Sequence, residues 1–398
     1  MESALAAGRP GNSAGDAAVP IPDSSRQVTP TAESFVTEEV FFAVIDFQFN
    51  YPSLGTEAAL ISAALRKHEP KSVASRSDTQ CAGTTEHRKV AASYLSRENF
   101  TIPPSCVFLC AGGHAAISAA FASASLDGSA IAVDEITYPH FRAMAAEHHI
   151  QLIACAGDGD GMLPDALADA ATVHGVKAVY LMPTVHNPLG TVMSSARRLA
   201  LADIVRQHTL FLIEDDAYRF LEPAGPDPIS FLIPESSFYI FSFSKPISPD
   251  LRVAYVLIPE RLSANAEDWI AQIGSGISLP FAEALTSLVL DGTVSRLIAA
   301  KRALGRERQA LISSSLSGLK IRAHRNAFHS WIELPKRTDA AAFCSACEAK
   351  GVLIGSGARY GNGGPAALRY VRLAVGNERN LDRIIAGLAT VNLIASSA

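Results

Sequence analysis

Residues 178–215 read AVYLMPTVHNPLGTVMSSARRLALADIVRQHTLFLIED: an apolar run, a polar turn, an amphipathic stretch and a second apolar run. Short apolar runs that alternate with helical stretches are typical of βαβ units, in which helices join parallel strands and cover the sheet. The stretch therefore predicts an α/β fold with a mainly parallel sheet between helices.

The same alternation extends in both directions along the chain. CVFLC is followed by GHAAISAAFASAS and SAIAVDE by FRAMAAEHH, and further on come SFYIFSFS and VAYVLIP. After Pro259 the pattern changes to a long helical region. Short apolar runs then separate helices again: LKIRA, HSWIELP, GVLIG and LRYVRLAV. We therefore expect a smaller α+β domain at the C-terminus.

The length of 398 residues favours two packed domains. We predict a large domain over residues 61–290 and a small C-terminal domain over residues 291–398. Residues 36–60 are expected to form an N-terminal arm that joins the small domain. Residues 1–35 are rich in Ala, Gly, Ser and Pro without periodic apolar positions, so we expect a flexible segment outside the core.

Composition narrows the classes of partner. The formal net charge of -5 gives neither a basic stripe for nucleic acid nor a polybasic patch for a membrane, so a small-molecule substrate fits best. No stretch approaches a membrane span or a signal peptide. Six thinly spread cysteines favour a reducing, cytoplasmic location. Cys344 and Cys347 form a CxxC without a second pair, so we interpret them as buried helix residues and expect no metal site.

Polar side chains follow the apolar runs where an open α/β sheet binds its ligands, beyond the carboxyl ends of its strands. Among them, Lys245 lies close to hydroxyl and guanidinium groups of Ser242, Ser244 and Arg252, which are suited to a phosphate dianion. In a desolvated, cationic site, such a lysine can lose its proton and become a nucleophile. Taken alone, Lys245 could also be an ordinary surface lysine.

SFSKPISPDLRVAY, residues 242–255, resembles the lysine motif S-x-S-K-x-x-x-P-G-x-R-x-G of the fold-type I pyridoxal 5′-phosphate (PLP) enzymes of aminotransferase class I/II. Asp250 and Ala254 replace two glycines of that motif, and the other positions keep their spacing. The sequence is similar in particular to MocR-type aminotransferase-like domains and to aminoadipate and kynurenine aminotransferases. The resemblance implies an aspartate aminotransferase-like fold, PLP as the cofactor and Lys245 as the residue that holds it as a Schiff base.

Two segments of the first half resemble family motifs for the phosphate and the ring of PLP. LCAGGHAAISAAF is similar to T-x-G-S-Q-x-A, which implies that Gly112, Gly113 and His114 bind the phosphate at a helix N-terminus. DEITYPHF is similar to D-P-T-Y-P-G, which implies that Tyr138 stacks on the pyridine ring. Without the resemblance, these segments would be a tight turn and a core tyrosine.

Two further segments resemble motifs that contact polar atoms of the ring. HNPLG is similar to N-P-T-G, which implies that Asn187 donates to the phenolic oxygen. EDDAY is similar to D-x-x-Y, which implies that Asp215 keeps the pyridine nitrogen protonated and that Tyr218 contacts the phenolic oxygen. By register, Asp216 or Glu214 could take the place of Asp215.

Two segments, at opposite ends of the chain, are predicted to contact the substrate. ALRYVRLAVG resembles a family segment in which arginine grips the substrate α-carboxylate, and this implies that role for Arg372, with Arg369 ranked second. DFQFNYPSLG replaces the family's small G-x-P turn by Asn50, Tyr51 and Pro52. We expect Asn50 and Tyr51 to line the substrate entrance.

One family feature is changed. Family members usually carry a tyrosine that reaches the neighbouring subunit's cofactor phosphate, so the resemblance implies a homodimer with active sites at the interface. Here Asp78 falls near that position. A carboxylate cannot donate to phosphate as a phenol does, so this segment must be built differently or serve another purpose.

The resemblance implies an aminotransferase in which Lys245 acts as general base and acid on an amino acid. The same carbanion could instead be directed to elimination, decarboxylation, oxidation or carbon–carbon bond formation, because fold-level likeness does not separate these reactions. A third alternative is a ligand-sensing, non-catalytic domain, as in MocR-type regulators. Only a short Ala/Gly/Ser/Pro-rich stretch precedes Phe41, so we expect this alternative to be the least favoured.

Overall fold

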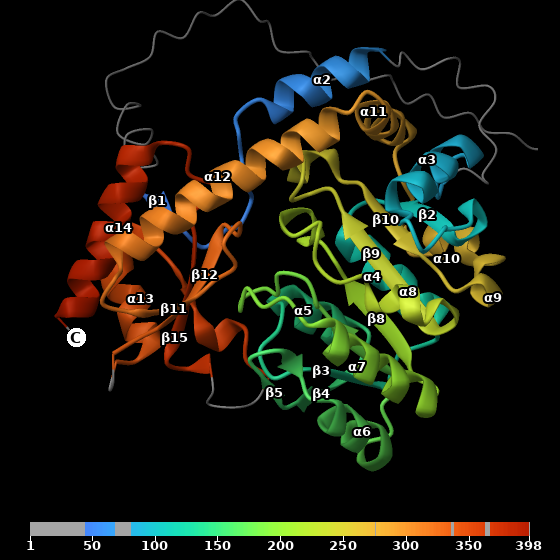
Figure 1. Ribbon diagram of the computed structural model, residues 1–398, viewed down its shortest axis with the longest axis horizontal. Coiled ribbons are helices and arrows are strands. Elements are labelled where there is room, and N and C mark those ends of the chain that lie inside the picture. Colours follow the sequence, from blue (N-terminus) through green and yellow to red (C-terminus); the bar gives the residue numbers. More distant parts are fainter. Residues whose placement is uncertain (1–43, 68–80, 275, 336–337, 363–366, 398) are drawn as a thin grey trace, which may run out of the picture. The chain divides into compact units, whose positions relative to one another are not determined.

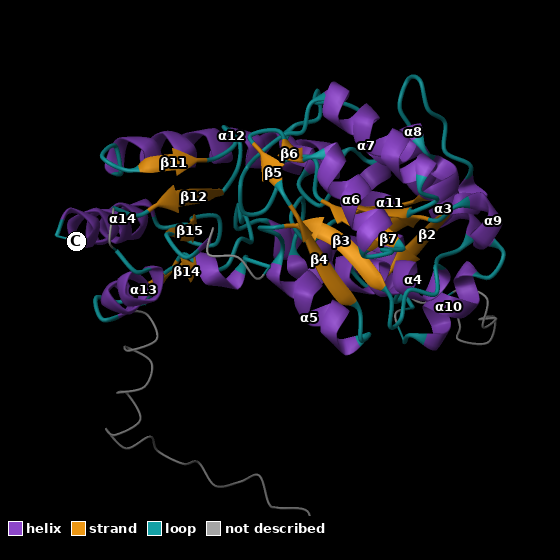
Figure 2. Ribbon diagram, turned by 90° about the horizontal axis from the view of Figure 1, so that it is seen from below, coloured by secondary structure: helices purple, strands orange, loops and turns teal. Residues whose placement is uncertain are grey.

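A seven-stranded sheet forms the centre of the computed structural model, which describes residues 44–67, 81–274, 276–335, 338–362 and 367–397. Figures 1 and 2 show its strands and the helices around them. The strand order is β2-β10-β9-β8-β7-β3-β4. The strands are β2 (Val107–Cys110), β3 (Ala130–Asp134), β4 (Gln151–Cys155), β7 (Ala178–Leu181), β8 (Phe211–Asp215), β9 (Ser237–Ser242) and β10 (Ala254–Leu257).

The sheet is parallel except for β10, which runs antiparallel to both of its neighbours, β2 and β9. All residues of the central strand β9 are buried. A strand that is covered on both faces of the sheet has no solvent side, which explains why residues 238–241 are continuously apolar instead of alternating. The predicted mainly parallel sheet between helices is confirmed.

Helices cover both faces of this sheet. Because consecutive side chains of a strand point to opposite faces, Phe238 and Ile240 pack in one cluster with α4 and α10, and Tyr239 and Phe241 in another with α3 and α11. The helices of this part are α2 (Glu57–Lys67), α3 (Thr85–Leu95), α4 (Gly113–Ser123), α5 (Pro139–Glu147), α6 (Pro164–Val173), α7 (Ser195–Gln207), α8 (Ile229–Leu232), α9 (Glu260–Ser263), α10 (Ala266–Gln272) and α11 (Leu279–Leu290). A small hairpin joins β5 (Gly157–Asp158) to β6 (Gly161–Met162).

Helix starts carry the expected local signals. The Ser194 side chain caps α7 by accepting from the N–H of Arg197 at 3.2 Å, and the Asp339 side chain caps α13 (Ala340–Glu348) by accepting from the N–H of Ala342 at 2.9 Å. Proline occupies the first turn of α5, α6 and α11, where its missing N–H costs no helical hydrogen bond. These residues determine where each helix begins.

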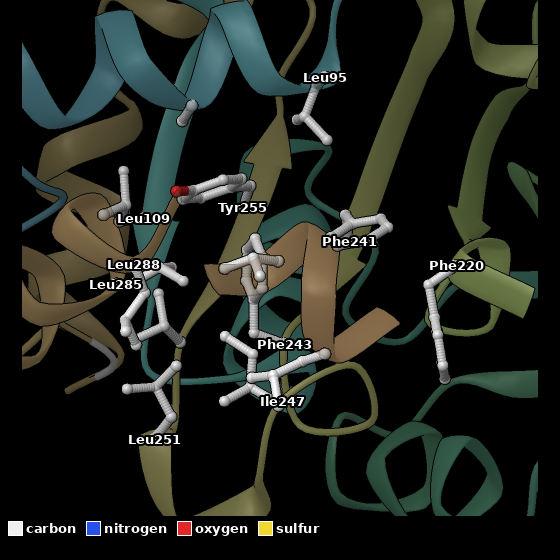
Figure 3. Close-up of a cluster of buried hydrophobic side chains, with 14 of the residues drawn as sticks. Leu95, Leu109, Phe220, Phe241, Phe243, Ile247, Leu251, Tyr255, Leu285 and Leu288 are labelled. Atoms are coloured by element: carbon white, nitrogen blue, oxygen red, sulfur yellow. The ribbon is translucent and has the colours of Figure 1, made fainter. Parts of the chain in front are cut away.

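The loop after β9 packs into the hydrophobic cluster that contains Tyr239, Phe241 and residues of α3 and α11. Phe243 and Ile247, two residues on either side of Lys245, are fully buried there with Leu251 and Leu285 (Figure 3). Packing on both sides leaves little freedom to the backbone at Lys245. The fold therefore holds the backbone of this residue and leaves its side chain to project.

A second, four-stranded antiparallel sheet has the order β11-β12-β15-β14. Its members and the helices beside it are β11 (Lys320–Arg322), β12 (His329–Glu333), β14 (Gly355–Ser356), β15 (Tyr370–Ala374), α13 (Ala340–Glu348) and α14 (Leu381–Ser396). The predicted run GVLIG forms two strands instead of one. Val352–Leu353 (β13) pairs with Ile45–Asp46 (β1), and Gly355–Ser356 pairs with β15, because the chain changes partner at Ile354.

Helix α12 (Thr293–Ser315) contacts α11 beside the large sheet and α14 beside the small one (Figure 1). The predicted domain limits at residues 61, 291 and 36 stay predictions, and residues 1–35 and Asp78 lie outside the described residues. Both cysteines of the CxxC lie in α13, with Cys347 buried and Cys344 partly exposed. Among the described helices, none combines the length and apolar character needed to cross a bilayer.

Candidate active site

A pocket opens where the parallel strands end. Residues that follow five strands line it together with Tyr51. They are Gly113, His114, Ile117, Tyr138, Met182, Asn187, Asp215, Ala217, Tyr218, Ser242, Ser244, Lys245 and Arg252. A larger cavity near Phe100 and Leu257 is mainly apolar, so the convergence of reactive groups places the candidate site in the first pocket.

Three predicted residues lie just outside this lining. Gly112 directly precedes α4, Asn50 donates to the hydroxyl of Tyr218 at 3.0 Å, and Arg372 donates to Asn187 Oδ1 at 3.2 Å. The fold thus brings all the predicted site residues into or next to one pocket. Their roles remain predictions.

Lys245 projects into the pocket from the anchored loop. Its Nζ donates to the backbone oxygen of Asn50 at 2.7 Å and lies 3.6 Å from the ring centroid of Tyr51. Burial lowers the pKa of Lys245 to about 7; the charge of Arg372 adds to this effect, and Asp215 opposes it. At neutral pH, a large fraction of this amine is therefore unprotonated, the form that attacks a carbonyl carbon.

Asp215 is the last residue of β8, and two donors hold its carboxylate. Oδ2 accepts from the hydroxyl of Tyr180 at 2.9 Å and Oδ1 from the N–H of Ala217 at 3.2 Å. Burial raises the pKa of Asp215, and these two hydrogen bonds partly offset the rise. A carboxylate so placed can pair with a protonated ring nitrogen.

Glu214 and Asp216, the alternatives to Asp215 in the sequence, bind other groups. Glu214 accepts from the N–H and hydroxyl of Ser230 at 2.7 and 2.6 Å, and Asp216 accepts from the hydroxyl of Tyr239 at 3.0 Å. Both carboxylates are fully buried. Of the three acids, only Asp215 belongs to the described lining of the pocket.

Donors suited to a phosphate gather at the start of α4. The first turn of a helix leaves backbone N–H groups without helical partners, and its dipole favours an anion. Gly112 has φ +95°, a conformation that favours glycine, and a Cβ added to Gly113 would lie 3.4 Å from Cβ of Ser242. The hydroxyls of Ser242 and Ser244 lie 3.2 Å apart, and Arg252 also lines the pocket. Together these groups form a cradle for a dianion.

The pocket-lining Tyr138 contacts two histidine side chains. The hydroxyl of Tyr138 lies 3.0 Å from Nε2 of His114, and the ring of His140 lies 5.2 Å from that of Tyr138. Burial raises the pKa of Tyr138, so its phenol stays protonated. Its ring remains available to stack on a flat ligand.

The guanidinium of Arg372 comes from β15 of the small sheet. It donates to Asn187 Oδ1 and to the backbone oxygen of Gln48, while its Nε is buried and has no hydrogen-bond partner in the described part of the chain. Arg369 instead pairs with Glu333 at 3.1 Å and is about half exposed. The geometry therefore favours Arg372 over Arg369 as the group that can receive a carboxylate.

Sequence reasoning missed Tyr180 and gave no role to His329. Tyr180 lies on β7 within an apolar run, where only its polar hydroxyl hinted at a partner. His329 lies in the quoted strand HSWIELP, is fully buried and faces Asn50 Nδ2 at 3.0 Å. A buried histidine in an apolar strand signals a polar partner, but that partner lies 279 positions away in sequence.

The pocket fits a flat aromatic ring that carries phosphate, an aldehyde and a basic nitrogen. The cradle at α4 suits the phosphate, the unprotonated amine of Lys245 suits the aldehyde and the carboxylate of Asp215 suits the nitrogen. Asn187 and Tyr218 offer polar atoms along one edge, and Tyr138 offers a ring face. This donor set matches PLP.

Comparison with known proteins also supports a PLP-binding site. The family profile "Aminotransferase class I and II" matches residues 43–388. The chain is 27% identical over 301 residues to the uncharacterized HTH-type transcriptional regulator YdeF of Bacillus subtilis, covering 76% of this chain and 65% of that protein. It is 28% identical over 214 residues to the 2-aminoadipate transaminase of Thermus thermophilus, covering 50% of this chain and 53% of that protein.

The fold also matches solved structures. An archaeal alanine:glyoxylate aminotransferase superposes with a TM-score of 0.80 at 19% identity, over 89% of this chain and 91% of that one. The chain spans less than two thirds of the length of the two curated relatives. The predicted aspartate aminotransferase-like fold is confirmed, and the family match supports PLP as the cofactor. Because the family profile covers most of its length, the chain belongs to the aminotransferase class I and II family.

Proposed function

We propose that the chain is a PLP-dependent aminotransferase that acts on an amino acid. The observation that carries the proposal is one pocket with a lysine amine of pKa about 7, a partly buried carboxylate whose pKa is raised and a phosphate cradle. Lys245 would hold the cofactor covalently, and Asp215 would pair with its ring nitrogen. When bound, PLP supplies an electron sink for a carbanion at the substrate's α-carbon.

The other pocket residues are proposed to bind either the cofactor or the substrate. The N–H groups of Gly113 and His114, with Ser242, Ser244 and Arg252, would bind the phosphate. Further members of the proposed site are Gly112 before the cradle, Tyr138 at the ring face, Asn187 and Tyr218 at the phenolic oxygen, and Asn50 and Tyr51 at the substrate entrance.

The chain's own residues can bind the substrate and move its proton. Arg372 would orient the amino acid through its α-carboxylate, because a guanidinium offers two parallel N–H donors. The amine of Lys245 would act as the general base, and its pKa of about 7 in the cofactor-free chain lies in the range in which a base is effective at neutral pH. The same amine would then carry the proton from the substrate's α-carbon to C4′ of the bound cofactor.

A panel of amino acids tests the reaction type. We expect the PLP-loaded protein to convert at least one of them to its 2-oxo acid, identified by mass spectrometry, in step with the loss of the cofactor's aldehyde form. Release of ammonia, carbon dioxide or peroxide instead would contradict transamination and favour the alternative reactions of the same fold.

The likeness to YdeF favours a second candidate, a ligand-sensing domain. In that case the pocket would bind PLP or an amine without turnover. The two candidates differ in one measurement, made with an amino acid and a 2-oxo acid that can accept its amino group. A sensor would show binding by calorimetry but no product after prolonged incubation, whereas an enzyme would release product in more than stoichiometric amount.

We also propose a homodimer with active sites at the interface and a cytoplasmic location. The family membership supports the dimer, and the six free thiols support a reducing compartment. Amino acids, as small-molecule substrates, are the proposed partners, and not nucleic acid or membranes.

A further inference from the structure

A chain of buried polar groups lies behind Tyr218. The Nδ2 atom of Asn50 lies 3.0 Å from the hydroxyl of Tyr218 and 3.0 Å from Nδ1 of His329. The Nε2 atom of His329 lies 3.1 Å from the backbone oxygen of His186. Asn50 is 3% exposed and His329 is 0% exposed, so water does not compete for these contacts.

The direction of each hydrogen bond in this chain is determined. A backbone carbonyl only accepts, so Nε2 of His329 carries a proton and donates it to His186. A second proton on the ring is disfavoured, because burial, the charge of Arg372 and that of Lys245 lower the pKa of His329 to about 3. His329 is therefore neutral, and its Nδ1 is an acceptor.

An acceptor at Nδ1 requires a donor, which must be the amide nitrogen of Asn50. The second N–H of the same amino group points to the hydroxyl oxygen of Tyr218, which accepts it. The proton of Tyr218 must then point away from Asn50. Because Tyr218 lines the candidate pocket beside Asn187, the proton is directed into that pocket.

We propose that Asn50 and His329 are positioning residues that direct the hydroxyl proton of Tyr218 into the pocket, for donation to the phenolic oxygen of PLP. The proposal deepens the proposed function and rests on it. Asn50 belongs to the segment that replaces the family's small G-x-P turn.

The first test reads the tautomer without any cofactor. In the cofactor-free chain labelled with ¹⁵N-histidine, the two-bond NMR spectrum is expected to show His329 as the neutral Nε2–H tautomer. Its signals are assigned by their loss in His329→Gln, or by their shift in the isosteric Asn50→Asp variant if the first does not fold. His174→Gln, at an exposed position, is the matched control.

Asn50→Asp reverses the chain of hydrogen bonds. A carboxylate only accepts, so His329 is expected to become doubly protonated in this variant, and Tyr218 is expected to donate to residue 50 instead of to the pocket. An Nδ1–H tautomer or a charged His329 in the unmodified chain would overturn the proposal. So would a His329 spectrum that Asn50→Asp leaves unchanged.

A double-mutant cycle tests whether Asn50 acts through Tyr218. We expect Asn50→Asp to raise the apparent Kd for PLP at least about tenfold in the unmodified chain and less than about twofold when Tyr218→Phe is already present. An equal effect in both backgrounds would mean that residue 50 acts by its own charge, and would overturn the proposal. If the unmodified chain fails to bind PLP, the proposed function fails, while the NMR spectrum still decides the tautomer.

Discussion

Arg372 is the residue whose role can be isolated most cleanly, because Arg369, just before the strand that carries Arg372, offers a matched control. Replacing Arg372 by Lys removes the planar fork but keeps the charge, so we expect KM for the amino acid to rise about 10- to 100-fold. The Kd for PLP is expected to change less than about twofold. Arg369→Lys, which affects only the exposed pair with Glu333, should leave both values unchanged. A larger effect at Arg369 than at Arg372 would contradict the assignment.

The lowered pKa of Lys245 makes the capture of PLP depend on pH. Only the unprotonated amine reacts, so below a pKa of about 7 the rate should fall about tenfold per pH unit, and above it the rate should level off. Stopped-flow absorbance of the cofactor-free chain mixed with PLP measures this profile. A rate that keeps rising through pH 10, near the ordinary pKa of lysine, would show that burial does not depress the pKa.

At the scale of residues, the motifs identified side chains that line the pocket but not the residues behind them. Asp215 ends β8, and Lys245 and Asn187 lie in the loops after β9 and β7, so that all three could be located from the ends of apolar runs. Tyr180, His329 and the pairing of either with the site depend on contacts distant in sequence, for which spacing carries no signal.

Two elements, α2 and α12, are joined by a buried ion pair beneath the site. Lys301 of α12 lies 3.1 Å from Glu57 of α2 and donates to the backbone oxygens of Lys245 and Ile247 at 3.2 and 2.6 Å. Glu57 in turn accepts from the N–H of Leu54 at 2.8 Å. The pair therefore connects the loop that carries Lys245 with the segment that carries Asn50 and Tyr51.

Replacing one partner of this ion pair should lower the stability of the protein, because it leaves the other charge buried without a partner. We expect Lys301→Met or Glu57→Gln each to lower the free energy of unfolding by about 3–5 kcal/mol, and the double variant to lose less than the sum, since it leaves no uncompensated charge. Urea unfolding measures all three. Lys89→Met, which breaks an exposed pair with Glu86, is the control and should change stability by less than about 1 kcal/mol. Additive losses would contradict the coupling.

The pH dependence of the same pair has a defined sign. Burial alone would raise the pKa of Glu57, but hydrogen bonds from the backbone and the charge of Lys301 outweigh it, so the pKa is lowered. Burial lowers the pKa of Lys301 as well, and Glu57 partly offsets this. The stability that the wild type gains over Glu57→Gln is therefore present above the ordinary glutamate pKa and is lost as the pH falls through the lowered value.

Elements were predicted well where packing follows the apolar pattern and poorly where it does not. Six of the seven strands of the large sheet lie within the quoted apolar runs, because those strands are largely buried, whereas the edge strand β4, which is partly exposed, lies in no quoted run. GVLIG gave no sign that its two halves pair with different strands, β1 and β15, since strand partners are not encoded in a five-residue pattern.

At the scale of the whole molecule, the seven-stranded sheet places reactive groups from five strand ends at one edge, and Arg372 reaches the site from the second sheet. We expect the protein to be a homodimer, with a mass by light scattering of twice the 42.1 kDa of the chain at micromolar concentration. A mass of one chain under these conditions would contradict the dimer. The overall fold could be predicted because βαβ alternation constrains topology strongly, whereas nothing in a single sequence specifies which surface pairs.

Reduction of the PLP-loaded protein with borohydride, followed by peptide mass spectrometry, tests the central claim most directly. The account predicts one PLP-sized adduct per chain, on the peptide that contains Lys245, and its loss in Lys245→Ala but not in the exposed-lysine control Lys177→Ala. An adduct on another lysine, or an adduct that persists in Lys245→Ala, would contradict it.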